Sequence, residues 1–172
     1  MSSLHRLGIG GVHFIVFALV AADLSSIQAG HNPLHIEMEP IVSDPEAIDI
    51  AKAYILPEYK SELPSYPMGA VTLANIRSGR ADVNDDGIKE LFIEVDHAAV
   101  CGTAGCPIEI FQKKRGKWRS ICGYMGMAVW MRAEKDGGYH QIEARMRLDG
   151  AIDIARWKHG ACYVPANPAE SG

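Results

Sequence analysis

Hydrophobic residues recur along the chain at two different spacings, and the change between them separates a helical part from a strand-forming part. In residues 47–55 apolar side chains return every three or four positions, which is the spacing of one helix face. Pro57 then predicts the end of this helix, because proline has no N–H for the helical ladder and its ring clashes with the preceding turn. Residues 58–68 are expected to form a covering loop.

The start of this helix carries signals of its own. Asp44 can cap the first turn, and Pro45 suits the first helical position. Ser43 and Glu46 also have the spacing of a capping box. We therefore expect the helix to begin within residues 43–46.

From residue 70 onward the apolar period becomes two, which is the period of a β-strand. Leu91, Ile93 and Val95, for example, fall on one face of such a segment. Comparable segments follow at residues 108–112, 118–122, 127–131, 142–148 and 152–157, separated by glycine-containing turns. The expected fold class is α+β, with one N-terminal helix packed on a curved, mainly antiparallel sheet of about six or seven strands.

The chain of 172 residues suits one domain. An apolar run at residues 12–22 follows Arg6 and precedes small residues, which predicts a secretory signal peptide cleaved after Ala22 or Ala29. The alternative, an uncleaved membrane anchor, needs a run of at least ~17 apolar residues. We therefore expect a signal peptide at residues 1–29, an extended arm at 30–42, a single α+β domain at 43–165 and a flexible C-terminal tail at 166–172.

The formal net charge of the chain is −4, which bears on its partners. Binding to nucleic acid depends on neutralising phosphates with lysine and arginine, so we expect no nucleic-acid partner. No later segment of the sequence is long and apolar enough for stable membrane insertion after signal cleavage. The expected location is the periplasm or the extracellular space.

Four cysteines follow the predicted signal peptide, and an even number in a small secreted domain predicts two disulfides. Of the three possible pairings we favour Cys101 with Cys106 and Cys122 with Cys162. The alternative is a zinc site that uses the ligands His97, Cys101, Cys106 and Cys122. Zinc sites more often repeat a Cys-x₂₋₄-Cys pair, so disulfides are favoured.

Oxygen-bearing side chains occupy every second position of a short acidic segment, at Asp82, Asn84 and Asp86. Calcium binds about six to eight oxygens, which such a loop can direct to one side. Gly87 stands where the loop must turn sharply, and Glu90 adds a further carboxylate. The alternative is an acidic turn without metal, because Asn-Asp-Asp-Gly is also favourable turn chemistry.

The pattern Asp-x-Asn-x-Asp-Gly resembles the calcium loops of EF-hands, dockerins and integrin-type propeller blades. The resemblance implies a structural calcium ion whose ligands are the side chains of Asp82, Asn84 and Asp86, the carbonyl of Ile88, and Glu90 directly or through water. The bidentate glutamate of an EF-hand would fall at Ile93, and the flanks alternate like strands. Propeller blades are therefore the closer analogy, and we expect weak affinity, with Kd of ~10⁻⁴–10⁻³ M.

A second resemblance covers roughly half of the chain. Its motifs are the acidic segment 82–90, Cys-Gly-x-x-Gly-Cys-Pro at 101–107, Gly-x-Trp at 116–118, Gly138-Tyr139, Trp157, Gly160 and Tyr163. In these motifs the chain is similar to small secreted bacterial proteins of unassigned function. The resemblance implies an exported single domain and no particular activity.

Three further groups of residues carry candidate chemistry. Glu90, Glu94 and Asp96 fall on one strand face, where a carboxylate pair could serve a hydrolase, although the bland interpretation is an exposed strand face. A basic turn could contact an anionic partner, or it could be a solvated hairpin end; its cations are Lys113, Lys114, Arg115 and Lys117. Trp118, Trp130 and Trp157 could form a ligand platform, but tryptophans on strands usually belong to the core.

Taken together, these patterns predict an exported, disulfide-linked, calcium-binding domain. No Gly-x-Ser-x-Gly or His-Glu-x-x-His motif is present, so a non-catalytic role is favoured over enzymatic activity. The expected function is recognition of a protein or cell-envelope polymer, as an inhibitor, an immunity-type factor or an envelope-binding module. The alternative is a small cell-envelope hydrolase that uses a carboxylate pair.

Overall fold

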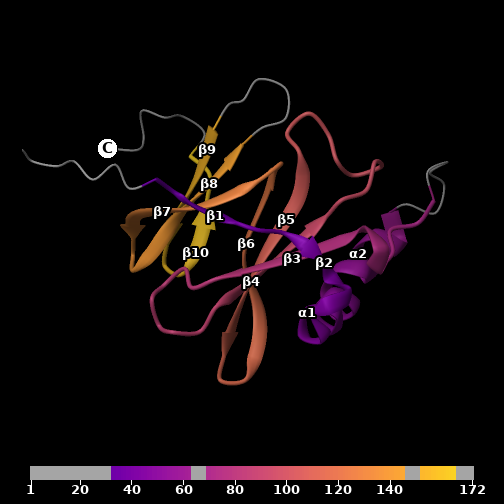
Figure 1. The fold of residues 1–172 in the computed structure, drawn as a ribbon, viewed down its shortest axis with the longest axis horizontal. Coiled ribbons are helices and arrows are strands. Elements are labelled where there is room, and N and C mark those ends of the chain that lie inside the picture. Colours follow the sequence, from indigo (N-terminus) through magenta and orange to yellow (C-terminus); the bar gives the residue numbers. More distant parts are fainter. Residues whose placement is uncertain (1–31, 63–68, 146–151, 166–172) are drawn as a thin grey trace, which may run out of the picture. The chain divides into compact units, whose positions relative to one another are not determined.

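The computed structural model describes residues 32–62, 69–145 and 152–165 (Figure 1). In these residues the chain forms ten strands, arranged in two antiparallel sheets of five strands each. The predicted signal peptide, the predicted C-terminal tail and residues 63–68 of the predicted covering loop lie outside the described residues.

The two sheets are named here by their strands. The central sheet has the order β2 (Glu39–Pro40), β3 (Ile76–Ala81), β4 (Glu90–Val95), β5 (Cys106–Lys114) and β6 (Lys117–Gly126). The flanking sheet has the order β1 (Leu34–Ile36), β7 (Val129–Asp136), β8 (Tyr139–Arg145), β9 (Ile152–Lys158) and β10 (Ala161–Tyr163).

The expected α+β fold, with an N-terminal helix on one sheet, is therefore wrong. The protein is mostly β, and its helical segment is internal, because β1 and β2 precede it. These two short strands carry no alternation of their own and pair with β7 and β3, far away in sequence. The strands that alternation did predict divide between two sheets instead of continuing as one meander.

The helical segment begins as the sequence predicts. After a 3₁₀ turn, Ile41–Ser43, the helix α1 (Pro45–Ile50) is capped by Asp44, whose carboxylate accepts the Ala47 N–H at 3.0 Å. The predicted capping box is absent, because the Ser43 hydroxyl donates to the Pro40 carbonyl and Glu46 binds Lys113 instead.

Pro57 does not end the helix. A π-helical turn, η2 (Ala51–Ile55), precedes it, and α2 (Leu56–Glu62) continues beyond it in place of the expected loop. In η2 the Leu56 N–H bonds to the Ala51 carbonyl, five residues back. In a regular α-helix the ring of Pro57 would clash with the carbonyl group four residues earlier. The wider π-helical turn moves the preceding carbonyl groups away from the ring. A short 3₁₀ turn, η3 (Leu73–Asn75), then leads into β3.

Strand β4 lies at the middle of the structure, and all six of its residues are buried. Leu91, Ile93 and Val95 pack with the helical segment, in a cluster that includes Ile50. Phe92 points the other way, into a second cluster that includes Trp157 of the flanking sheet. The central sheet is thus covered by the helical segment on one face and by the flanking sheet on the other.

Both disulfide pairings favoured from the sequence are present. Cys101–Cys106 closes the loop between β4 and β5. Cys122–Cys162 joins β6 of the central sheet to β10 of the flanking sheet. The second bond therefore holds the two sheets together near the end of the described chain.

Candidate functional site

The acidic segment forms a tight loop between β3 and β4. Asp85 and Gly87 adopt positive φ angles of 57° and 83°, so the chain turns back on itself within a few residues. Three of the predicted ligands are drawn together by backbone N–H groups inside this loop. The bonds are Asp86 N–H to Asp82 Oδ1 (3.2 Å) and to Asn84 Oδ1 (3.0 Å), Gly87 N–H to Asp82 Oδ2 (2.8 Å), and Ile88 N–H to Asp86 Oδ1 (2.8 Å).

These hydrogen bonds do not use all the lone pairs of the loop oxygens. Each carboxylate oxygen has two lone pairs, and a bond to one N–H uses only one of them. Asp86 and Ile88 are exposed at the protein surface. The side chains of Asp82, Asn84 and Asp86 carry hard oxygen atoms of the kind that calcium prefers.

Glu90 is not brought into this group. As the first residue of β4 it is only 1% exposed. Its carboxylate accepts the Val83 N–H at 2.9 Å and the Gln112 side-chain amide at 3.1 Å. Burial raises the pKa of Glu90, against the effect of these hydrogen bonds. The structure thus gives Glu90 the role of an anchor in the core, beneath the loop.

The loop also contacts the flanking sheet through Asp85, a residue that the ligand pattern passed over. Its carboxylate forms an ion pair with Lys135 and lies 3.1 Å from His140 Nε2. Hydrogen bonds from Lys135 and then His140 hold the pKa of Asp85 below its usual range. The backbone N–H of His140 also donates to the Val83 carbonyl at 2.7 Å. Since these partners are about 50 residues away, no local pattern could have revealed them.

The backbone of Val83 is therefore shared by the two sheets. Its N–H is held by Glu90 of the central sheet, and its carbonyl by His140 of the flanking sheet. Val83 itself is fully buried. The acidic loop starts from a fixed point at the junction of the sheets.

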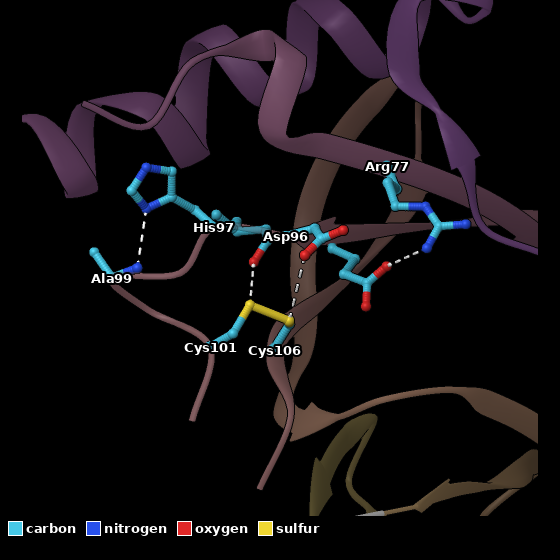
Figure 2. The surroundings of a disulfide bond; sticks show 8 residues. Arg77, Asp96, His97, Ala99, Cys101 and Cys106 are labelled. Atoms are coloured by element: carbon cyan, nitrogen blue, oxygen red, sulfur yellow. Dashed lines mark hydrogen bonds and ion pairs between the residues drawn. A yellow bond between two sulfur atoms is a disulfide. The ribbon is translucent and has the colours of Figure 1, made fainter. Parts of the chain in front are cut away.

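The predicted zinc alternative falls on the Cys101–Cys106 disulfide (Figure 2). In the described part of the chain, Asp96, Cys101 and Cys106 bring three possible ligand atoms close together. The two sulfurs are bonded to each other and are not free thiolates. The nearby His97 side chain accepts the Ala99 N–H at 3.1 Å. Zinc chemistry has no support in this geometry.

The predicted carboxylate face is not exposed. Glu94 is 4% exposed, and its carboxylate lies 3.7 Å from the Arg77 guanidinium. Burial raises the pKa of Glu94. Only Asp96 of the three carboxylates reaches the surface. The three tryptophans likewise form no shared platform, because Trp157 is buried, whereas Trp118 and Trp130 lie half-buried on different sheets.

A different carboxylate pair lines a groove that the sequence did not predict. This groove, of about 260 Å³, runs between α2 and the strands β5 and β6, and its polar lining includes Glu58, Tyr59 and Glu109. Burial raises the pKa of Glu109, with a further contribution from Glu58, against a hydrogen bond from Ser120. Gly123 leaves room for this side chain, since a Cβ there would lie 3.0 Å from Glu109 Oε2.

Comparison of the chain with protein-family models, curated proteins and solved structures found no match. In the residues that the structure describes, no helix is both long and apolar enough to cross a membrane. The two disulfides are typical of proteins from oxidising compartments.

Proposed function

We propose that this protein is an exported, calcium-binding domain that recognises another macromolecule in the periplasm or outside the cell, and that it does so without catalysis. The observation that carries the proposal is the acidic loop, which gathers Asp82, Asn84 and Asp86 above a backbone anchor shared by both sheets. A cation bound there would have a structural role, because it would hold the loop at the sheet junction.

The proposed calcium ligands are the side chains of Asp82, Asn84 and Asp86 and the carbonyl of Ile88, completed by water. Glu90 is left out as a direct ligand, because its carboxylate already accepts two hydrogen bonds in the core. Lacking a bidentate glutamate, the site belongs with the weaker extracellular modules, with Kd of ~10⁻⁴–10⁻³ M.

Thermal unfolding of the purified protein with added calcium tests this site. At 100 times its Kd, calcium should raise the free energy of unfolding by ~2.7 kcal/mol, which for a domain of this size is a Tm increase of roughly 5–10 °C. The double variant Asp82→Asn/Asp86→Asn keeps one side-chain oxygen at each position as an acceptor for the loop N–H groups, and it should abolish the increase.

Asp49→Asn is the matched control, because Asp49 is exposed on α1, away from the loop. This variant should respond to calcium like the unchanged protein. An unchanged Tm in the presence of roughly 10 mM calcium, about 100 times a Kd of 10⁻⁴ M, would contradict the calcium part of the proposal.

One observation favours hydrolysis as a second candidate function. Glu109, with its raised pKa, could serve as a general acid beside Glu58 in the open groove, as in enzymes that use two carboxylates. In that case Glu109→Gln should abolish release of reducing ends from a cell-wall polysaccharide, whereas Glu39→Gln on the exposed edge strand should not. No activity in the unchanged protein would remove this candidate.

A further inference from the structure

The end of the β5–β6 hairpin, residues 113–119, is named here the basic hairpin. It carries five cations and no carboxylate, although the whole chain has a net charge of −4. Its cationic residues are Lys113, Lys114, Arg115, Lys117 and Arg119. In Figure 1 this hairpin reaches the bottom of the view, beyond β4.

The base of the basic hairpin is fixed to the helical segment. Glu46 Oε1 accepts hydrogen bonds from Lys113 Nζ at 2.6 Å and from the Trp118 indole N–H at 3.0 Å. The Arg80 guanidinium also lies 5.7 Å from the Trp118 ring. The hydrogen bond from Lys113 leads the effects that lower the pKa of Glu46, so this carboxylate is ionised at neutral pH. These contacts hold the hairpin in one position.

The turn of the basic hairpin presents cations that the fold leaves unused. Lys114, Arg115 and Lys117 are exposed, and none of their side chains has a hydrogen bond or ion pair with another described residue. Arg80 and Arg132, by contrast, are each paired with carboxylates. Three charges at one turn are therefore available to a partner.

Arg115 also occupies an unfavourable position for a residue with a side chain. Its φ angle is 53°, and Gly116 follows with a φ of 75°, which makes a two-residue hairpin turn of the kind that prefers Asn-Gly. This left-handed conformation is unfavourable for arginine, because its Cβ comes close to the backbone. No contact of the Arg115 side chain with another described residue compensates for this conformation. Binding of the guanidinium to an external ligand is a physical reason for an arginine at this position.

We propose that the basic hairpin binds clustered phosphate groups, through Arg115 as a forked donor and Lys114 and Lys117 as point charges. This inference rests on the proposed recognition function and names its partner class as a phosphate-bearing polyanion. The phosphates could belong to anionic lipid headgroups or to a soluble chain, and the two sources present the same chemistry to the turn.

Binding is tested with the purified protein and two probes, a fluorescent inorganic polyphosphate chain and vesicles of phosphatidylcholine with phosphatidylglycerol. Calcium is left out, because it bridges phosphates by itself. With three phosphate contacts, log K should fall with log[salt] with a slope of about −2, a loss of roughly twenty-fold between 50 and 200 mM salt. Each cation removed should weaken vesicle binding by about five-fold.

The main variant is Lys114→Gln/Arg115→Asn/Lys117→Gln, which should abolish binding. Asparagine at position 115 suits the positive φ, so this variant is expected to remain folded. The control, Lys52→Gln/Lys60→Gln/Lys158→Gln, changes the net charge equally at three exposed lysines on other elements and should bind like the unchanged protein.

Each outcome decides the proposal. The proposal is supported if the unchanged protein and the control bind one probe or both and the main variant does not. The probe that is bound then identifies the source of the phosphates. Failure of both probes overturns it, and so do equal losses in the two variants. Equally tight binding of poly-glutamate would also overturn it in favour of an acidic protein partner. The calcium response of the same samples is measured alongside, so that failure of phosphate binding remains distinct from failure of the calcium site.

Discussion

Gly105, in the disulfide loop between β4 and β5, leaves no room for a side chain against the backbone of Gly126. Its φ angle is 110°, outside the regions that residues with side chains ordinarily occupy. A Cβ at this position would lie 2.2 Å from the carbonyl carbon of Gly126, at the end of β6. Replacement by alanine therefore requires both an unfavourable backbone conformation and a movement of β6.

The expected cost of Gly105→Ala follows from these two effects. A residue with a side chain in such a region of φ and ψ costs about 1–3 kcal/mol. Overpacking against a rigid neighbour adds about 1–3 kcal/mol. Their sum predicts that the free energy of unfolding falls by about 2–6 kcal/mol.

Gly102→Ala is the matched control, since Gly102 belongs to the same loop and pairs with Gly105 through both backbone hydrogen bonds. A Cβ at Gly102 meets no heavy atom within 4 Å, and its φ is not positive. The free energy of unfolding should change by less than about 0.5 kcal/mol. Urea unfolding with the disulfides intact measures both variants, and equal stability of the two would refute the argument from Gly126.

Two further predictions concern the disulfides and a buried carboxylate. Replacing Cys122 and Cys162 by serine should lower the free energy of unfolding by ~4 kcal/mol, and replacing Cys101 and Cys106 by ~2 kcal/mol, because the first disulfide closes the longer loop. Urea unfolding measures both variants, and the reverse order of stability would contradict this prediction. Burial raises the folded-state pKa of Glu94 above its usual range, so the contribution of Glu94 to stability is complete at low pH and is lost as pH rises through the folded-state pKa. Glu94→Gln should therefore gain Tm relative to the unchanged protein between about pH 4 and pH 8, and a difference independent of pH would argue against it.

Local signals along the sequence predicted those elements whose partners lie nearby. Asp44 and Pro45 marked the helix start because a cap involves only the first turn. The hairpin of β5 and β6 followed from alternation around a glycine turn. The even cysteine count predicted two disulfides, and the favoured one of the three possible pairings is the one present. In each case the deciding interaction lies within a few residues or is set by a covalent bond.

The division into two sheets could not be predicted in this way. β1 pairs with β7, nearly a hundred residues later. The edge strands β1 and β2 are too short to show a hydrophobic period of their own. The helix beyond Pro57 was missed for a similar reason, because the apolar contacts of Ile55 and Leu56 with the core favour a continued helix over a break. Tertiary packing decided these elements, and local propensity did not.

The burial of Glu90 and Glu94, by contrast, had a signal in the sequence. Phe92 stands between them on the same face of β4, while Leu91 and Ile93 occupy the other face. A strand that is apolar on both faces is covered on both sides, so carboxylates beside Phe92 must be buried. The exposed acidic face was inferred from charge alone, and the neighbouring phenylalanine argues against it.

The same burial determines how a cation at the acidic loop would act. Val83 is held by Glu90 from one sheet and by His140 from the other, so the loop cannot open without disturbing the sheet junction. Asp82 and Asn84 stand directly before and after Val83, so their oxygens are positioned before any ion binds. Little conformational entropy of the loop then remains to be lost on binding. A calcium ion should therefore delay unfolding of both sheets together. A response confined to the loop would instead show that the anchor at Val83 is weaker than its two hydrogen bonds imply.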